Sequence, residues 1–259
     1  MNFSELANKH CSIRRYKPDP VPEEILERIL GAALRASSSG NMQSYSIIVT
    51  TDASIKQALY EPHFKQKMVL EAPIVMTFCS DFHRMRLWLK ERDAQDNFDN
   101  FMSYMIGAID AVLAAQNAAL TAEAEGLGIC YMGTTLASCR EIATILKCPD
   151  NVVPVTGFVL GYPDETPTVR DRLPLDGMIH RDTYQDYSVD DINRIYKDRD
   201  VNGWNRYMTY PELKAMVETS GVKNLAQLYT TVKYTRESHI KYSQNVLSCL
   251  KEHDFLNHD

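Results

Sequence analysis

Residues 97–125 restrict the fold of this chain more than any other segment. They read as one long helix in which the polar residues Ser103, Asp110 and Asn117 recur at seven-residue spacing, while most of the remaining circumference is Ala, Met, Ile, Leu or Val. A helix that is apolar nearly all round must be buried. We therefore expect this helix in the centre of the core or at a subunit interface. Its polar side chains argue against a membrane span.

Shorter segments predict a sheet and further helices around the long one. Apolar, branched residues predict four strands, and apolar positions that recur from Ile25 to Leu34, after Pro22, predict a helix. The predicted strands cover residues 46–50, 74–79, 129–132 and 152–160. Strands and helices mix without a regular βαβ alternation, which favours an α+β fold.

The texture of the chain changes after Tyr187. Charges become dense and balanced, and aromatic residues are dispersed. This pattern predicts helices that cover roughly 189–198, 210–219 and 235–250. We therefore expect a main domain at residues 1–187 and a helical extension at 188–259 that packs on it.

Charge and cysteine content exclude several classes of protein. The formal net charge of the 259 residues is -6 at pH 7, whereas a general binder of nucleic acid or of anionic membranes needs a basic face. The six cysteines are scattered without two-residue spacing, which argues against a zinc site or a disulfide scaffold. Free thiols in a reducing cytoplasm are the simplest account, and the first residues show no secretory signal. We expect a cytoplasmic protein.

Two clusters of cations are suited to bind a phosphate. His10, Ser12 and Arg14 place donors at alternate positions, so that in an extended loop they can point the same way, and Arg170 and Arg172 repeat this spacing. A phosphate dianion is held best by several charge-assisted donors. The alternative is that the first cluster is a helix-end loop of solvated cations and the second a surface salt-bridge pair.

A polar loop between these clusters suits a flat polar heterocycle. Ser38, Ser39, Asn41 and Gln43 lie directly before an apolar strand and can hydrogen-bond to such a group. The alternative is helix capping and turn chemistry, for which Ser, Gly and Asn are the usual residues. If the fold brings the loop and both cationic clusters together, the site binds a phosphorylated planar cofactor. The sequence has no Rossmann glycine pattern, no Walker loop and no paired metal-ligand histidines.

Taken together, these segments resemble the nitroreductase and flavin reductase family, most closely its larger, NADPH-preferring branch with a C-terminal helical extension. The segments that carry the resemblance are His10–Tyr16, Pro20–Leu26, Ser37–Gln43, Glu71–Ile74, Gly126–Gly133, Leu160–Pro163, Arg172–Pro174 and His180, in family order. The resemblance implies a mainly antiparallel sheet flanked by helices. It also implies a homodimer with flavin in the groove between the subunits.

By resemblance, the cofactor is FMN and NAD(P)H is the co-substrate. The residues implied to bind FMN are His10, Ser12, Arg14, Arg170 and Arg172 at the phosphate, Ser38 and Ser39 near the cofactor, Gln66 at the pyrimidine edge, and Tyr131, Met132 and Gly133 around the ring. Arg199 is implied to receive the 2′-phosphate of NADPH. The alternative for Gln66 and Arg199 is a solvated surface residue.

One position departs from the family pattern. The family has a second glycine after Gly133, whereas this chain has Thr134. A β-branched residue does not easily take a positive φ. Either the backbone here is ordinary, or the contact between this segment and flavin is altered.

The resemblance implies an FMN-dependent NAD(P)H oxidoreductase with ping-pong hydride transfer to a nitroaromatic, a quinone or free flavin. Flavin carries out the electron transfer and the protein supplies binding and electrostatics, so we assign no general acid, base or nucleophile. Two alternatives stay open. One is a flavin carrier or redox sensor with the same phosphate clamp, and the other is a helical interaction protein that uses the residues after Tyr187.

Overall fold

The computed structural model of the protein describes residues 2–258 and divides into two compact units. We call Met1–Thr168 together with Tyr242–Asp259 the first unit, and Val169–Lys241 the second unit. This division differs from the boundary expected after residue 187. Residues 169–187 group with the helices that follow them, and the chain from Tyr242 onward groups with the first unit. The packing of an extension on a main domain stays a prediction.

A four-stranded antiparallel sheet forms the centre of the first unit. Its strands are β1 (Tyr45–Thr50), β2 (Ile74–Asp81), β3 (Gly128–Tyr131) and β4 (Val152–Gly161), in the order β1-β2-β4-β3. Every neighbouring pair is antiparallel, and β2 and β4 shift register between Phe78 and Cys79. The four predicted strands and the α+β class with a mainly antiparallel sheet are confirmed.

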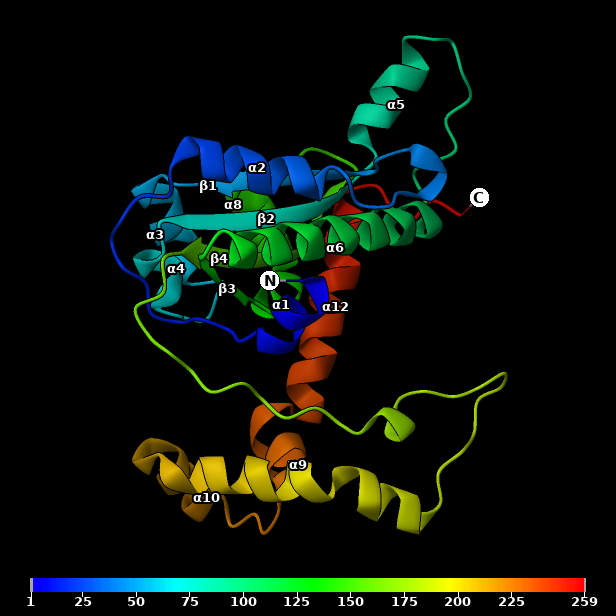
Figure 1. Cartoon of the computed structure of the whole chain (residues 1–259). Helices are drawn as coiled ribbons and strands as arrows, with labels where there is room; N and C mark the ends of the chain where they lie inside the picture. Colours follow the sequence, from blue (N-terminus) through cyan, green and yellow to red (C-terminus); the bar gives the residue numbers. More distant parts are fainter. Residues whose placement is uncertain (1, 259) are drawn as a thin grey trace. The chain divides into compact units, whose positions relative to one another are not determined.

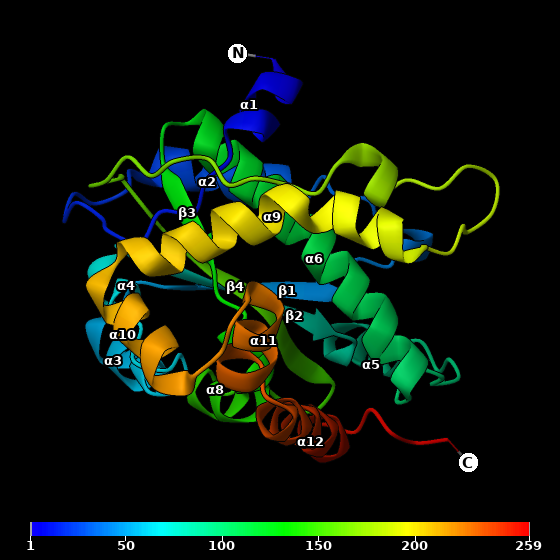
Figure 2. The same cartoon turned by 90° about the horizontal axis from the view of Figure 1, so that it is seen from below.

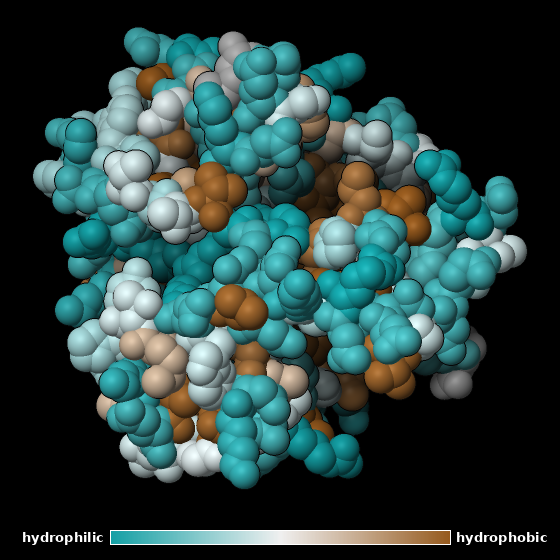
Figure 3. Space-filling view, turned by 60° about the horizontal axis from the view of Figure 1, so that its bottom comes forward, coloured by the Kyte–Doolittle hydropathy of each residue, from teal (hydrophilic) through white to brown (hydrophobic). Residues whose placement is uncertain are grey.

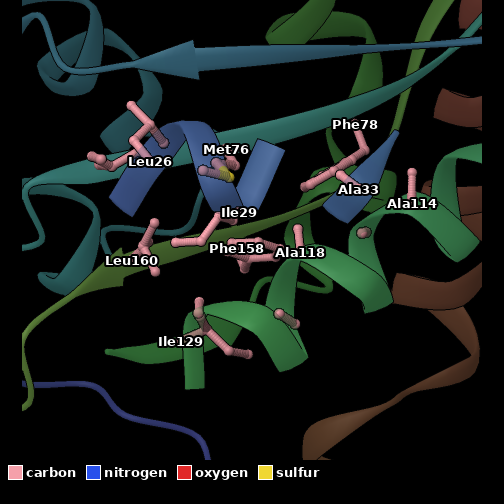
Figure 4. Packing of buried hydrophobic residues seen from close by; sticks show 14 of the residues in the cluster. Leu26, Ile29, Ala33, Met76, Phe78, Ala114, Ala118, Ile129, Phe158 and Leu160 are labelled. Carbon is pink, nitrogen blue, oxygen red and sulfur yellow. The ribbon is translucent and has the colours of Figure 1, made fainter. Parts of the chain in front are cut away.

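Helices cover both faces of this sheet. On one face lie α2 (Glu23–Ala33) and α6 (Phe101–Ala124), and on the other lie α3 (Ala53–Tyr60), α4 (Met68–Glu71) and α8 (Cys139–Ile145) (Figure 1). Side chains alternate along the strands, so that Met76 and Phe78 face α2 and α6, while Val75 faces the other layer. Figure 4 shows Ile29 of α2 and Ala118 of α6 packed against strand residues of the first layer.

The long helix α6 is buried on one side only. Its buried face is rich in alanine, which lets the helix approach the sheet closely, and it also carries Ser103 and Asp110. The opposite face exposes large apolar side chains, among them Met102 at 66% and Ile109 at 53%. By length and composition α6 is able to cross a membrane, but half of its most apolar window is buried in the unit. This is the behaviour of a core helix with a second, uncovered apolar face.

The remaining elements of the first unit are shorter. They are α1 (Phe3–Lys9), η1 (Ser39–Asn41), α5 (His83–Lys90) and α7 (Thr134–Ala137), with the end of α12 (Arg236–Glu252). Cys249 and Leu250 of α12, together with Phe255, pack in a separate apolar cluster with Phe82 and Tyr104. This cluster explains why the C-terminal residues group with the sheet.

The second unit is helical. Its elements are η2 (Leu175–Gly177), α9 (Val189–Thr209), α10 (Pro211–Ser220), α11 (Leu225–Leu228) and η3 (Tyr229–Lys233) (Figure 2). Its core joins Tyr207, Val217, Leu225 and Leu228. The helix expected at 189–198 runs on to Thr209. Gly203 lets this helix pack closely against the side chain of Leu225, because a Cβ at position 203 would lie 2.5 Å from a Leu225 methyl carbon. In the view of Figure 3, hydrophilic residues cover most of the surface and hydrophobic ones form separate patches.

Candidate functional site

The first cationic cluster lies in an extended segment that is hydrogen-bonded on both sides. The N–H of Ile13 donates to the carbonyl of Ile129 in β3 at 2.9 Å, and the N–H of Lys17 donates to the carbonyl of Tyr162 at 2.9 Å. Tyr16 also forms an isolated antiparallel bridge with Pro163. The segment therefore has the extended form that the alternate spacing of His10, Ser12 and Arg14 requires.

A carboxylate anchors the centre of this cluster. Oε1 of Glu165 accepts from the N–H of Arg14 at 2.5 Å and from the N–H of Arg15 at 3.2 Å. Burial raises the pKa of Glu165, but these two hydrogen bonds and the Arg15 guanidinium outweigh it, so that the pKa lies below its usual value. The guanidinium of Arg14 is exposed and has no side-chain partner among residues 2–258. Its backbone is fixed while its charge is available to a ligand.

His10 is already engaged through one ring nitrogen. Its Nδ1 lies 2.6 Å from Oε1 of Glu123, near the end of α6. The other carboxylate oxygen of Glu123 is buried without a partner in the described part of the chain. Only Nε2 of His10 is available to donate to a phosphate, so the predicted phosphate contact of His10 can involve this atom alone.

Asp110 organises the polar loop between Ser38 and Ser44. Its carboxylate accepts from Oγ of Ser38 at 2.6 Å, from the N–H of Ser39 at 3.1 Å and from Oγ of Ser44 at 3.0 Å. Oγ of Ser38 in turn accepts from the N–H of Gln43 at 2.7 Å. The Ser38 hydroxyl thus donates one hydrogen bond and accepts another within the protein, as expected if this loop serves turn chemistry. The side chain of Ser39 is exposed and makes no hydrogen bond among the described residues.

The segment after β3 presents open backbone at Gly133. Gly133 has φ −59°, and a Cβ at this position would meet no atom within 4 Å. Neither backbone conformation nor protein packing therefore requires glycine here, and the exposed position has room for a flat group. The side chains of Tyr131 and Met132 pack on opposite faces of the sheet: the Tyr131 ring lies 5.3 Å from that of Phe158, and Met132 is buried in the other apolar cluster. Any cofactor contact at these two residues is left to their backbone.

Thr134 has ordinary backbone geometry. It starts α7, and it is not among the residues with positive φ. The backbone at the position where the family has its second glycine is therefore ordinary, which was the first of the two alternatives. The Thr134 side chain is buried, and its Oγ1 lies 2.8 Å from Nδ1 of His63. Burial lowers the pKa of His63 to about 4.

Gln66 lies in the same loop as His63. The Gln66 N–H donates to the His63 carbonyl at 3.2 Å, and the residue is half-buried. Its side chain makes no hydrogen bond within the described residues that would fix it to the protein. This leaves the amide available to a ligand, as the resemblance implies.

The second cationic cluster and Arg199 belong to the second unit. Nη1 of Arg172 donates to the carbonyls of Arg170 and Asp171 at 3.3 and 3.2 Å. Arg199 lies 3.6 Å from the Asp171 carboxylate and donates to Oη of Tyr229 at 2.6 Å. Arg199 is thus not a solvated residue, although it stays partly exposed. The meeting of both clusters at one phosphate remains a prediction, since they belong to separate units.

Sequence reasoning missed four residues that hold these segments: Asp110 as an acceptor, Glu123, Glu165 and His63. Their partners lie 72, 113, 151 and 71 residues away along the chain. The sequence carries no local signal for such pairs. The one hint was the presence of Asp110 in an otherwise apolar helix.

The residues of the first unit fit a flat, phosphorylated ligand such as FMN. The available guanidinium of Arg14 suits a phosphate, and the open backbone at Gly133 suits an aromatic ring. Both belong to segments joined to β3, since Ile13 bonds to Ile129 and Gly133 follows the strand directly. These groups therefore suit the phosphate and the ring of such a ligand.

Known proteins share both the sequence and the fold of this chain. Residues 7–162 match the model of the Nitroreductase family. An NADPH-dependent oxidoreductase of Staphylococcus aureus (strain USA300) is 34% identical over 220 residues, which cover 80% of this chain and 87% of the relative. The NfrA1 nitroreductase from B. subtilis has a TM-score of 0.83 at 26% identity, over 96% of this chain and 98% of that one. The NADPH:FMN oxidoreductase from Vibrio harveyi, solved with NAD+, has a TM-score of 0.71 at 30% identity, over 89% and 97%.

Proposed function

Because the chain belongs to the nitroreductase family, we propose that it is an FMN-dependent NAD(P)H oxidoreductase. The observation that carries the proposal is the state of Arg14, whose backbone is fixed while its side chain is available. Glu165 and β3 fix its backbone, while the guanidinium has no side-chain partner within residues 2–258. An anionic cofactor is bound best by a cation whose backbone is fixed and whose guanidinium donors are not already used.

The chain's own residues bind and orient the cofactor. Arg14 would hold the phosphate of FMN, and Ser12 and Nε2 of His10 would add donors. The sequence predicts Arg170 and Arg172 as further phosphate ligands. Bound FMN supplies the hydride and electron chemistry.

Backbone and amide groups orient the ring. The backbone at Gly133 would contact the ring, and the Gln66 amide would bind its pyrimidine edge. Ser39 contributes its exposed hydroxyl near the ribityl chain, while Ser38 shapes the loop.

The substrates are small molecules that bind one after the other at the same site. NAD(P)H binds first and leaves, and a nitroaromatic, a quinone or free flavin follows it, which is a ping-pong order. Arg199 receives the 2′-phosphate of NADPH after exchanging its contact with Asp171, 3.6 Å away. The names of the relatives, an NADPH-dependent oxidoreductase and an NADPH:FMN oxidoreductase, support the nucleotide assignment.

The enzyme works as a homodimer in the cytoplasm. The support for a dimer is the uncovered apolar face of α6, which includes Met102, Ile109 and Leu113. A large exposed apolar patch marks an interaction surface. A cytoplasmic location fits the cysteines, all six of which are free thiols.

An absorption spectrum of the purified protein, before and after anaerobic NADPH, tests the function. We expect a flavin spectrum that bleaches with NADPH and returns when a nitroaromatic is added. A yellow protein that NADPH does not bleach would instead indicate a flavin carrier or sensor. A folded protein that stays colourless after incubation with FMN would overturn the proposal.

A further inference from the structure

His63 is a fully buried titratable residue whose role the cofactor contacts do not explain. Its side chain is fully buried, Nδ1 lies 2.8 Å from Oγ1 of Thr134, and Nε2 has no partner among the described residues. Leaving a buried polar atom unpaired costs about 1–3 kcal/mol. A buried polar atom without a partner needs an explanation, such as a role in binding or catalysis.

The hydrogen bond between His63 and Thr134 joins two segments that are both assigned to the flavin ring. One is the loop after α3, in which Phe64 and Lys65 take left-handed backbone conformations with φ of 55° and 57°. The Gln66 N–H donates to the carbonyl of His63, so the position of His63 also sets where Gln66 lies. The other segment is the start of α7, directly after Gly133.

The chemistry of the pair favours a fixed, neutral arrangement. A neutral imidazole has one donor and one acceptor nitrogen, and a threonine hydroxyl can serve either. Burial disfavours the charged form of His63 and lowers its pKa to about 4. With glycine at position 134, as in the family pattern, Nδ1 would lose its hydroxyl partner.

We propose that His63 and Thr134 form a matched pair of positioning residues for flavin binding. Through their hydrogen bond, the loop that carries Gln66 is held in register with the backbone at Gly133. Both segments would then keep fixed positions beside the proposed ring site. This inference rests on the proposed FMN site and assigns the reason for threonine in place of the second glycine.

Variants at position 134 separate the hydrogen bond from packing. Thr134→Val keeps the shape and removes the hydroxyl, and Thr134→Ser keeps the hydroxyl. Losing this bond should weaken FMN binding by about tenfold, measured by the quenching of flavin fluorescence, and should change the visible circular dichroism of bound flavin. Thr134→Ser should retain both wild-type values.

The neighbouring residue offers a matched control. Thr135 is also buried, and its Oγ1 has no partner in the described part of the chain. Thr135→Val should therefore leave the FMN dissociation constant and the dichroism spectrum unchanged. A role in packing alone would shift the melting temperature of Thr134→Val without moving these two readouts.

Two results would count against the inference in different ways. If wild-type protein binds FMN and folded Thr134→Val binds it equally well with the same dichroism, the positioning role is wrong while the proposed function stands. If folded wild-type protein binds no FMN, both fail together. Should Thr134→Val not fold, His63→Gln with the same two readouts decides, and wild-type FMN binding in that variant would overturn the role.

Discussion

Oγ of Ser38 donates to Oδ2 of Asp110 across 2.6 Å, and this contact ties the polar loop to the centre of the longest helix. Asp110 is fully buried and also accepts from Ser39 and Ser44. A buried carboxylate is tolerated only where such donors surround it. The polar stripe of α6 therefore faces inward, and the apolar residues around it divide between the sheet and an uncovered face.

Replacing Asp110 should destabilise the protein. Asp110→Ala leaves the Ser38, Ser39 and Ser44 donors without their acceptor, and we expect a loss of about 3 kcal/mol in the free energy of unfolding. Asp110→Asn keeps one acceptor oxygen and should lose less. Urea unfolding measures the difference, with exposed Gln116→Ala on the same helix as the control. Equal stability of Asp110→Ala and wild type would contradict the role of Asp110.

Removing two exposed arginines of the predicted phosphate clamp should release FMN. In the double variant Arg14→Ala, Arg172→Ala, each lost charge-assisted contact is expected to weaken binding by about tenfold or more. Equilibrium dialysis of FMN measures the effect, and exposed Arg92→Ala is the control. Flavin retention equal to that of wild type would remove the clamp assignment.

The stability of the first unit should fall as the pH drops below 6.5. The folded state holds His63 neutral because burial lowers its pKa to about 4, whereas an unfolded histidine binds a proton near pH 6.5. Between these values the unfolded state binds more protons, so stability decreases on acidification by at most about 3 kcal/mol and the loss is complete below pH 4.

Unfolding titrations from pH 7.5 to 4 test this prediction. The variant His63→Gln should show a flatter dependence on pH than wild type. His258→Gln, at an exposed position, should behave as wild type does. If stability depends on pH equally in His63→Gln and wild type, burial does not lower the pKa of His63 in the folded protein.

A side chain at Gly133 should disturb the cofactor without disturbing the fold. A Cβ at this position meets no protein atom within 4 Å, and φ is −59°. Gly133→Ala should therefore keep the melting temperature but weaken FMN binding, because the methyl group occupies space assigned to the ring. Gly31→Ala, which also meets no atom within 4 Å, is the matched control. Wild-type FMN affinity in Gly133→Ala would place the ring elsewhere.

A charge on the uncovered face of α6 should separate the proposed dimer. Ile109 is 53% exposed, so Ile109→Asp costs the single subunit little but buries an unpaired charge in an interface. Sedimentation velocity should find a dimer for wild type and a monomer for Ile109→Asp. Wild-type protein that sediments only as a monomer at micromolar concentration, with FMN bound, would exclude the dimer.

Much of the fold follows from local patterns. The four strands lie within two residues of their predicted ends, because branched apolar runs favour extended backbone wherever they are buried. The long helix was also predictable from its composition. The helix at Val189–Thr209 was predicted too short, since its charged middle looks like an end until Gly203 is seen packed against Leu225.

By itself, the sequence determined the four strands, the long helix and the family, and it predicted the residue types of a phosphate clamp, because all of these depend on short-range spacing. Only the tertiary structure decided which polar atoms are already occupied: Nδ1 of His10 by Glu123, the Arg14 backbone by Glu165, and Thr134 by His63. These partners come from distant parts of the chain. A hydrogen bond depends on the distance between two atoms in space, and no pattern along the chain encodes that distance.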